Sequence, residues 1–320
     1  MEKKYDVVCI GDATLDITMC NINPNALCVD ASYSDKIGIS LGGDASNQAS
    51  VLSKLGCKTA LIAKVGTDDF GDIIYKKICE ENLDSPLLIR CEEKGSGFCV
   101  VIVKPDGQRN FLVWPGNGKK DLSLAEIDLS FLSETRIVSV GSLFCLKELD
   151  HGGIREIFRE AQHQNVITIA DMTTDGYSIG PNAIADIYPY TDYLVPSFEE
   201  ACYVTGETNP ECIAQKLLNA GVKNVIIKLG AKGCYVRNRS ENFYTDPYDA
   251  TVVDTTGCGD NFVAGFITGL LHQFSLKKCA ELACACGSYN AQFVGAHGSI
   301  QSLDQIQMFQ RTAKQLDCNR

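Results

Sequence analysis

The segment 254–262 reads DTTGCGDNF and combines two acids, two threonines and a cysteine set between glycines. Apolar residues recur at helical spacing after it, which predicts a buried helix that starts between Gly257 and Asp260. Amide groups at a helix N-terminus bind anions, and glycines let a ligand approach the backbone closely. The backbone amides of Thr256-Gly257-Cys258-Gly259 are therefore predicted to form an anion site.

Two side chains of this segment could take part in catalysis. Asp260 alone is most simply a first-turn helix acid. Beside a bound phosphate, however, it could remove a proton from an attacking hydroxyl, and such a base typically contributes about 10²–10⁴-fold. Cys258 could be a nucleophile with a lowered pKa, but no histidine or orienting residue lies near it in the sequence. A small packing role is therefore favoured for Cys258.

The composition is that of a soluble globular protein with a small-molecule partner. Of the 320 residues, 45% are hydrophobic and 22% are charged. The net charge is −11 and no block of Lys and Arg is present, which argues against nucleic acid or an anionic membrane as a partner.

Sixteen cysteines would suit a disulfide-rich secreted protein, but other features of the sequence oppose that class. The start has no secretion signal, no apolar run approaches the length of a membrane span, and no pair has the C-x-x-C spacing of a zinc site. Many of the cysteines lie inside apolar runs, where they act as small hydrophobic residues. A reducing cytoplasm with free thiols is predicted.

Short β-rich runs alternate with longer helical patterns, which is typical of a parallel sheet covered by helices on both faces. The predicted strands are 5–10, 59–65, 136–141, 166–171, 193–196 and 224–230. The predicted helices are 44–55, 69–82, 150–164, 210–220, 260–274 and 276–294.

Two regions interrupt this alternation, at about 12–41 and 96–116. The second contains alternating strands around Asp106-Gly107, a pair favoured in tight hairpin turns. These regions are predicted to form a small antiparallel sheet that stands off the main one, as a lid or a dimer contact. The whole chain, 1–320, is predicted to be one large domain with this lid.

Several common catalytic motifs are missing from the sequence. It contains no G-x-x-x-x-G-K-[ST], no G-x-G-x-x-G after the first strand and no H-E-x-x-H. A standard P-loop, a dinucleotide fold and a zinc protease are therefore disfavoured. The four histidines offer little material for a histidine-based triad.

The motif DTTGCGD, together with three others, resembles the signatures of the ribokinase family, also called the PfkB carbohydrate kinases. The other matching motifs are LGGDASNQASVLSKLG at 41–56, AKVGTDDFG at 63–71 and KLGAKG at 228–233. The resemblance covers nearly the whole chain. It implies an α/β fold, a ribokinase-like three-layer α/β/α sandwich with a mostly parallel central sheet and a small β-sheet lid.

The resemblance implies roles for the residues that match the family motifs. Asp260 is expected to be the catalytic base, with the amides of Gly257, Cys258 and Gly259 as the anion hole. The expected substrate contacts are Asp16 assisted by Asp12, the glycines Gly42 and Gly43, Asn47, and from the lid Arg109, with Trp114 and Asn117 as further candidates. Asp44 is left open between a helix N-cap and a contact to a polyol substrate.

Further positions match the nucleotide and cation sites of the family. The expected nucleotide contacts are Lys228, Gly230, Gly233, Asn290 and Ser197. Ser197 stands where the family usually has the asparagine of Asn-x-x-Glu, which puts metal and triphosphate binding in doubt. Glu200 keeps the glutamate and is expected to organise Mg²⁺ indirectly, because Mg²⁺ keeps much of its water. Asp254 and Ser299 are expected to share a monovalent-cation site, for example for K⁺.

The implied activity is an ATP-dependent phosphotransfer, with Mg²⁺, to a hydroxyl of a small sugar or polyol. A nucleoside kinase on the same fold is the nearest alternative. A phosphofructokinase is disfavoured because acidic Asp44 stands where those enzymes often carry lysine. A non-catalytic sugar- or nucleotide-binding regulator is a further alternative, which Ser197 favours and Asp260 disfavours. A homodimer formed through the lid is also expected.

Overall fold

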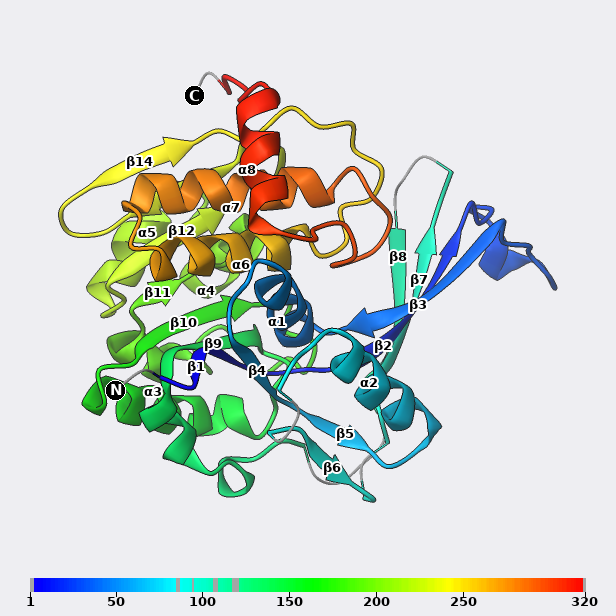
Figure 1. Ribbon diagram of the computed structural model, residues 1–320, viewed down its shortest axis with the longest axis horizontal. Coiled ribbons are helices and arrows are strands. Elements are labelled where there is room, and N and C mark those ends of the chain that lie inside the picture. Colours follow the sequence, from blue (N-terminus) through cyan, green and yellow to red (C-terminus); the bar gives the residue numbers. More distant parts are fainter. Residues whose placement is uncertain (1–2, 85–86, 94, 106–108, 117–120, 319–320) are drawn as a thin grey trace.

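The computed structural model describes residues 3–84, 87–93, 95–105, 109–116 and 121–318. Its main element is an eight-stranded sheet with the strand order β14-β13-β12-β11-β10-β9-β1-β4 (Figure 1). The strands are β1 (Tyr5–Ile10), β4 (Thr59–Ile62), β9 (Thr135–Leu143), β10 (Ile167–Met172), β11 (Tyr193–Leu194), β12 (Asn224–Lys228), β13 (Cys234–Arg237) and β14 (Asn242–Thr245). Only the pairs that involve β13 and β14 are antiparallel, so the predicted mostly parallel sheet is confirmed.

Helices cover both faces of this sheet (Figure 1). One face carries α1 (Asp44–Lys54), α2 (Asp69–Glu80), α6 (Cys258–Leu271), α7 (Leu276–Asn290) and α8 (Leu303–Thr312). The other carries α3 (Ile154–His163), α4 (Phe198–Thr205) and α5 (Pro210–Asn219). Strand β1 explains this arrangement, because Val7 and Cys9 enter one core cluster while Val8 and Ile10 enter the other. Each such buried Val or Ile side chain contributes about 1.5–3 kcal/mol.

A second sheet of four strands, with the order β3-β2-β7-β8, projects beside the main body (Figure 1). It is made of β2 (Thr14–Cys20), β3 (Lys36–Gly42), β7 (Phe98–Val103) and β8 (Arg109–Trp114). The predicted lid is therefore present, but the prediction that it is antiparallel was wrong. Strands β2 and β7 are parallel, because two separate hairpins join side by side. The expected Asp106-Gly107 turn lies outside the described residues.

Two predicted elements differ from the observed ones by more than a shift of their ends. The strand predicted at 59–65 divides at Ala63 into β4 and β5 (Lys64–Gly66), because the chain leaves the main sheet there to pair with β6 (Ile89–Cys91). The helix predicted at 150–164 is regular only from Ile154, since a turn at Leu149–Gly153 contains non-helical residues. The remaining short helical turns are η1 (Ala26–Cys28), η2 (Leu124–Glu126), η3 (Leu129–Glu134), η5 (Ala185–Tyr190) and η6 (Gly230–Lys232).

The strand order places a ligand site at one edge of the sheet. Strand β1 is followed by β4 on one side and flanked by β9 on the other, so the direction of strand addition reverses between β1 and β9. In open α/β sheets, ligands bind at the carboxyl ends of the strands beside such a reversal. Within the described part of the chain, no helix has the length and apolarity needed to cross a bilayer.

Candidate active site

Two pockets meet at the carboxyl edge of the main sheet. The first, here called the acidic pocket, has a volume of about 570 Å³. The side chains that characterise it are Asp12, Asp16, Asp44, Asn47, Asp171 and Asp260. The second, here called the apolar pocket, has a volume of about 280 Å³ and lies over α6 and α7. Both pockets are lined by Lys228, Thr255 and Gly259, so these residues mark their junction.

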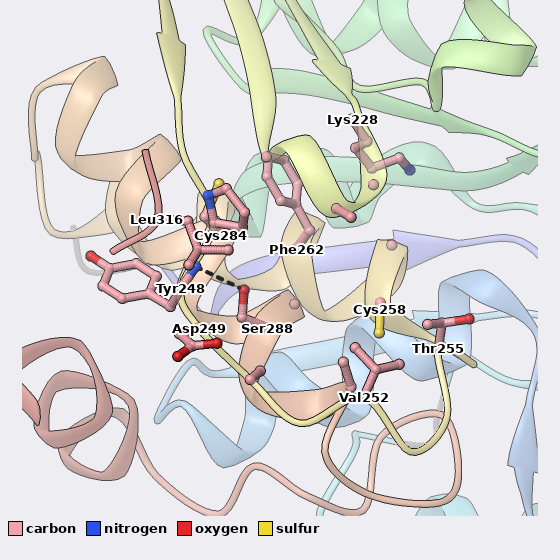
Figure 2. A pocket seen from close by; sticks show the side chains of 18 residues that line it. Lys228, Tyr248, Asp249, Val252, Thr255, Cys258, Phe262, Cys284, Ser288 and Leu316 are labelled. Atoms are coloured by element: carbon pink, nitrogen blue, oxygen red, sulfur yellow. Dashed lines mark hydrogen bonds between the residues drawn. The ribbon is translucent and has the colours of Figure 1, made fainter. Parts of the chain in front are cut away.

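The apolar pocket has the character of a site for a flat, partly apolar ligand group. Figure 2 shows that Tyr248, Val252, Phe262 and Leu316 surround it. Its rim is shaped by a fixed backbone, because the amide of Tyr248 donates to Ser288 Oγ at 3.1 Å. The predicted nucleotide glycines, Gly230 and Gly233, line the same pocket. The 247–252 segment and Leu316 were missed in the sequence, where they carry no recognisable motif.

The predicted anion hole lies at the junction of the pockets. Gly257 precedes α6 with a positive φ of 69°, and a methyl group there would stand 2.6 Å from Cα of Ala296. Asn261 locks this contact, since its Nδ2 donates to the carbonyl oxygens of Gly257 at 2.7 Å and Ala296 at 2.6 Å. The amide of Cys258 also donates to the Thr255 carbonyl at 3.3 Å within the turn. The start of α6 is thus held rigidly against the 294–298 loop.

Asp260 lies in the acidic pocket on the first turn of α6 and is buried. Its Oδ2 accepts a hydrogen bond from Nδ2 of Asn47 at 2.8 Å. Burial and then the negative charge of Asp171 raise the pKa of Asp260 to about 7, while Asn47 and Lys228 act in the opposite direction. A carboxyl group with this pKa is well suited to accept a proton near neutral pH.

A buried ion pair lies beside Asp260. Lys228 Nζ contacts Asp171 Oδ1 at 2.6 Å, and Gln48 Nε2 donates to Asp171 Oδ2 at 3.2 Å. Burial would lower the pKa of Lys228, but Asp171 and Glu200 hold it above its usual value, so the ammonium stays charged. A methyl group at Gly259 would stand 3.4 Å from Lys228 Nζ, which places this charge at the anion hole.

Asp171 and Gln48 were not predicted as site residues. Asp171 ends the run 166–171, and an acid at the carboxyl end of a parallel strand is a signal that could have identified it. Gln48 follows Asn47 on α1 and would have been found only from the helix geometry. Its Oε1 accepts from Ser139 Oγ at 3.3 Å, so it connects two strands of the main sheet to the site.

Of the predicted substrate residues, Asp12, Asp16, Gly43, Asp44 and Asn47 line the acidic pocket, and Gly42 lies beside it against Asp16. Asp16 is buried, and this burial raises its pKa to about 6. A methyl group at Gly42 would overlap the Asp16 carboxylate, and one at Gly43, which has a φ of 92°, would stand 2.5 Å from the Asp12 carbonyl oxygen. These two glycines therefore allow the start of α1 to lie against the turn after β1.

Asp44 does not cap α1. Gly43 holds the cap position, and Asp44 is the first helical residue. The carboxylate lines the acidic pocket, where burial and then the charges of Asp260 and Asp171 raise its pKa well above the usual value. Of the two roles left open by the sequence, the helix N-cap is excluded, and the contact to a polyol substrate stays a prediction.

The lid contributes Phe111 and Val113 to the wall of the acidic pocket. Because side chains alternate along a strand, Trp114 lies on the opposite face of β8 from these two residues, and it is exposed. The side chain of Arg109 and the whole of Asn117 lie outside the described residues, so their expected substrate contacts stay predictions.

Ser197 and Glu200 line the acidic pocket and cap α4 reciprocally. Ser197 Oγ accepts from the Glu200 amide at 3.3 Å, and Glu200 Oε2 accepts from the Ser197 amide at 2.7 Å. Serine thus takes over the N-cap function that asparagine can also perform. Among the described residues, no group of three or more His, Cys, Asp and Glu side chains is arranged to hold a metal ion.

The predicted cation and second nucleotide residues lie around the loop before α6. Asp254 accepts from the Thr256 amide at 2.9 Å and the Thr256 hydroxyl at 2.6 Å, and from the Gly295 amide at 2.9 Å. Ser299 donates to Asn290 Oδ1 at 2.6 Å, and Asn290 Nδ2 donates to the Thr256 carbonyl at 2.8 Å. These contacts brace the loop, and direct contacts to a cation or a nucleotide stay predictions.

Comparison with known proteins agrees with this arrangement. The model of the pfkB family carbohydrate kinases matches residues 4–303. The chain is 26% identical over 311 residues to an ATP-dependent 6-phosphofructokinase of Thermoanaerobacterium thermosaccharolyticum, covering 95% of this chain and 94% of that protein. It is also 26% identical over 316 residues to a ribokinase of Schizosaccharomyces pombe, covering 94% of this chain and 96% of the relative.

The fold has close counterparts among solved structures. A putative ribokinase II from E. coli, in complex with ATP and Mg²⁺, superposes with a TM-score of 0.84 at 22% identity. The superposition covers 97% of this chain and 99% of that chain. The predicted ribokinase-like α/β fold is confirmed.

Proposed function

The chain belongs to the pfkB family of carbohydrate kinases, and from this premise we propose that it transfers the γ-phosphoryl group of ATP to a hydroxyl of a small sugar or polyol. One observation carries the proposal. Buried Asp260, with a pKa raised to about 7, lines the acidic pocket from the first turn of a helix, and the residue before it, Gly259, lines both this pocket and the apolar one. This places a base, an anion site and two ligand volumes in contact.

In the proposed mechanism, the adenine ring of ATP lies in the apolar pocket, and the phosphates of ATP extend to the junction of the two pockets at Lys228 and Gly259. The acceptor lies in the acidic pocket with one hydroxyl directed at Asp260. Asp260 takes the hydroxyl proton as the oxygen attacks the γ-phosphorus, and the bond from this phosphorus to the bridging oxygen of ADP breaks. The ammonium of Lys228 and the amides at the start of α6 stabilise the negative charge of the transferring group.

The site fits Mg²⁺ bound mainly by phosphate oxygens and water. Asp171 and Glu200 provide carboxylates near Lys228, and both carboxylates already accept hydrogen bonds from the protein. Water-mediated contacts from these two side chains would suit the octahedral, strongly hydrated ion. When bound, Mg²⁺ would neutralise charge on the phosphates.

The acceptor is proposed to be uncharged. Asp12, Asp16 and Asp44 line its pocket, and the ammonium of Lys228 is assigned to the transferring phosphoryl group. Carboxylates accept hydrogen bonds from vicinal hydroxyls but repel a phosphate that is already present on the substrate. The acidic lining therefore favours a sugar or polyol over a sugar phosphate, although one relative is a 6-phosphofructokinase.

A nucleoside acceptor is the second candidate, and a specific contact favours it. Phe111 of the lid faces the acidic pocket, where an aromatic ring could stack on a nucleobase. Sugars also pack on aromatic rings, so the two candidates differ in how far activity depends on Phe111. Phe111→Ala should lower kcat/KM more for a nucleoside than for a simple sugar.

The decisive experiment is a coupled assay of ADP release with sugars, polyols, sugar phosphates and nucleosides as acceptors. A neutral sugar or polyol should give the highest kcat/KM. If ATP binds and none of these acceptors stimulates ADP release, the regulator alternative replaces the kinase.

The location and assembly of the protein are proposed as well. All sixteen cysteines are free thiols in the structure, which is consistent with a reducing cytoplasm. The lid exposes apolar side chains, among them Ile37, Ile39, Leu112 and Trp114. Pairing of two lids would cover this surface and give a homodimer, which sedimentation equilibrium can test.

A further inference from the structure

A chain of polar contacts leads away from Asp260 toward the opposite side of α1. Asn47 Nδ2 donates to Asp260 Oδ2 at 2.8 Å, and Asn47 Oδ1 lies 3.0 Å from Nδ1 of His297. The other ring nitrogen, Nε2, lies 3.6 Å from Glu81 Oε1. Lys54 closes the chain, since its Nζ contacts Glu81 Oε2 at 2.7 Å and the His297 carbonyl oxygen at 3.2 Å. None of Lys54, Glu81 and His297 lines the acidic pocket.

The order of donors and acceptors in this chain is fixed by chemistry. In its ionised form, which the proposed mechanism requires, the carboxylate of Asp260 can only accept, so the NH₂ group of Asn47 must face it. The carbonyl oxygen of Asn47 then faces His297, and it too can only accept. The ring must therefore carry a hydrogen on Nδ1. If the hydrogen were on Nε2 alone, Asn47 would turn its amide over and present its oxygen to Asp260.

The ring of His297 is held in place from several directions. The side chain is buried, at 4% exposure, in the 294–298 loop. The neighbouring residue, Ala296, packs on Gly257 and accepts from Asn261. Burial would raise the pKa of Glu81, but its contacts with His297 and Lys54 outweigh this effect and hold that pKa at about 2. A charged carboxylate thus lies behind the ring.

We propose that His297 is a positioning residue, whose Nδ1–H fixes the amide of Asn47 so that its NH₂ group is directed at Asp260. This inference rests on the proposed function, because it assigns Asp260 as the base and Asn47 as a neighbour of the acceptor. His297 acts only through Asn47. Its loss should therefore leave Asp260 with an amide that can turn over and weaken the alignment of the base.

Two substitutions separate the hydrogen bond from the shape of the ring. His297→Leu removes the donor, and kcat should fall about ten- to hundred-fold, as expected for a lost hydrogen bond to a group that bears on the reacting atoms. His297→Asn keeps an N–H donor on Cγ, where Nδ1 is attached, and should recover most of the rate. His163→Leu and His163→Asn are matched controls, because His163 is exposed at the end of α3, and both should behave as wild type.

The split between kinetic constants distinguishes positioning from a general structural role. Asn47 lies in the acidic pocket, so His297→Leu should change kcat while the KM for ATP stays within about two-fold. Collapse of the 294–298 loop would instead disturb Gly257 and raise the KM for ATP. A raised KM for ATP, or a His297→Asn variant as slow as His297→Leu, would overturn the proposal.

A spectroscopic readout tests the same contact without any activity. The protein has four histidines, so ¹⁵N-histidine labelling gives few signals, and His297→Asn identifies the one from His297. In the wild-type protein, Nδ1 of His297 should carry a proton, whereas an unprotonated Nδ1 would refute the inference whatever the kinetic constants of the variants. If no acceptor is phosphorylated but Nδ1 is protonated, the proposed function fails and the hydrogen-bond order stands.

Discussion

The pKa of Asp260 leads to a pH dependence that the kinase reaction should display. The base must be ionised, and its pKa is raised to about 7. One pH unit below this value only about a tenth of the carboxyl groups are ionised, so kcat/KM should fall about ten-fold per unit below pH 7. An unperturbed aspartate, with a pKa of 3.8, would leave the rate flat down to about pH 5.

The fall in kcat/KM below pH 7 is the acid limb of the pH profile. Two neighbouring charges should move the midpoint of this limb in opposite directions. The negative charge of Asp171 raises the pKa of Asp260, so Asp171→Asn should shift the limb to lower pH. The positive charge of Lys228 lowers that pKa, so Lys228→Met should shift the limb to higher pH. Both variants will also lower the maximum kcat/KM, because they alter the site. The pH at the midpoint of the acid limb does not depend on this maximum.

The assay is kcat/KM for ATP between pH 5 and 9, with the coupling enzymes in excess at every pH. Equal ionic strength throughout keeps the screening of these charges constant. A wild-type midpoint near 4, or shifts of both variants in the same direction, would refute the assignment of Asp260 as a buried base under the influence of Asp171 and Lys228.

Four further predictions follow from the site. Asp260→Asn should lower kcat by about 10²–10⁴-fold and leave the affinity for ATP, measured by calorimetry, unchanged. Because the pKa of Asp260 is raised in the folded state, its ionised carboxylate destabilises the fold above pH 7. The Asp260→Asn variant should therefore also melt at a higher temperature than the wild type at pH 8. Gly42→Ala should weaken acceptor binding more than ten-fold, measured as KM, since the methyl group displaces the Asp16 carboxylate. Cys258→Ala should keep kcat within about two-fold, because the thiol has no part in the proposed mechanism and alanine leaves the backbone at the start of α6 unchanged. Removal of Mg²⁺ with a chelator should abolish turnover and Mn²⁺ should restore it, whereas full activity in the chelator would contradict the proposed metal site.

Much of the fold could be predicted because local patterns and the parallel sheet agree. Strand β1 was predicted with its observed bounds, since five of its six side chains are buried and its apolar run is short. The division of 59–65 could not be predicted, because the apolar run continues unchanged while the chain changes sheets at Ala63. The parallel pairing of β2 with β7 depends on contacts between distant segments, which no local pattern encodes.

The candidate site divides in the same way. Asp260, Asp16 and Asn47 belong to motifs, and all three line the acidic pocket. Asp171 belongs to no recognised motif, and the GAHGS stretch at 295–299, which matches the family, assigns no role to His297. Each of the two residues nevertheless bears on Asp260, Asp171 through its charge and His297 through its contact with Asn47. Such residues come from other elements of the chain, and only folding brings their side chains to the site.

The two acids of segment 254–262 show why residue type alone cannot assign a role. Both Asp254 and Asp260 are buried. Asp254 accepts hydrogen bonds on both carboxylate oxygens, from Thr256 on one and from Gly295 on the other, so its lone pairs already serve the loop. Asp260 instead lines a pocket beside another carboxylate, and its affinity for a proton is raised. Hydrogen bonding makes the first acid a brace, and burial beside a like charge prepares the second to accept a proton.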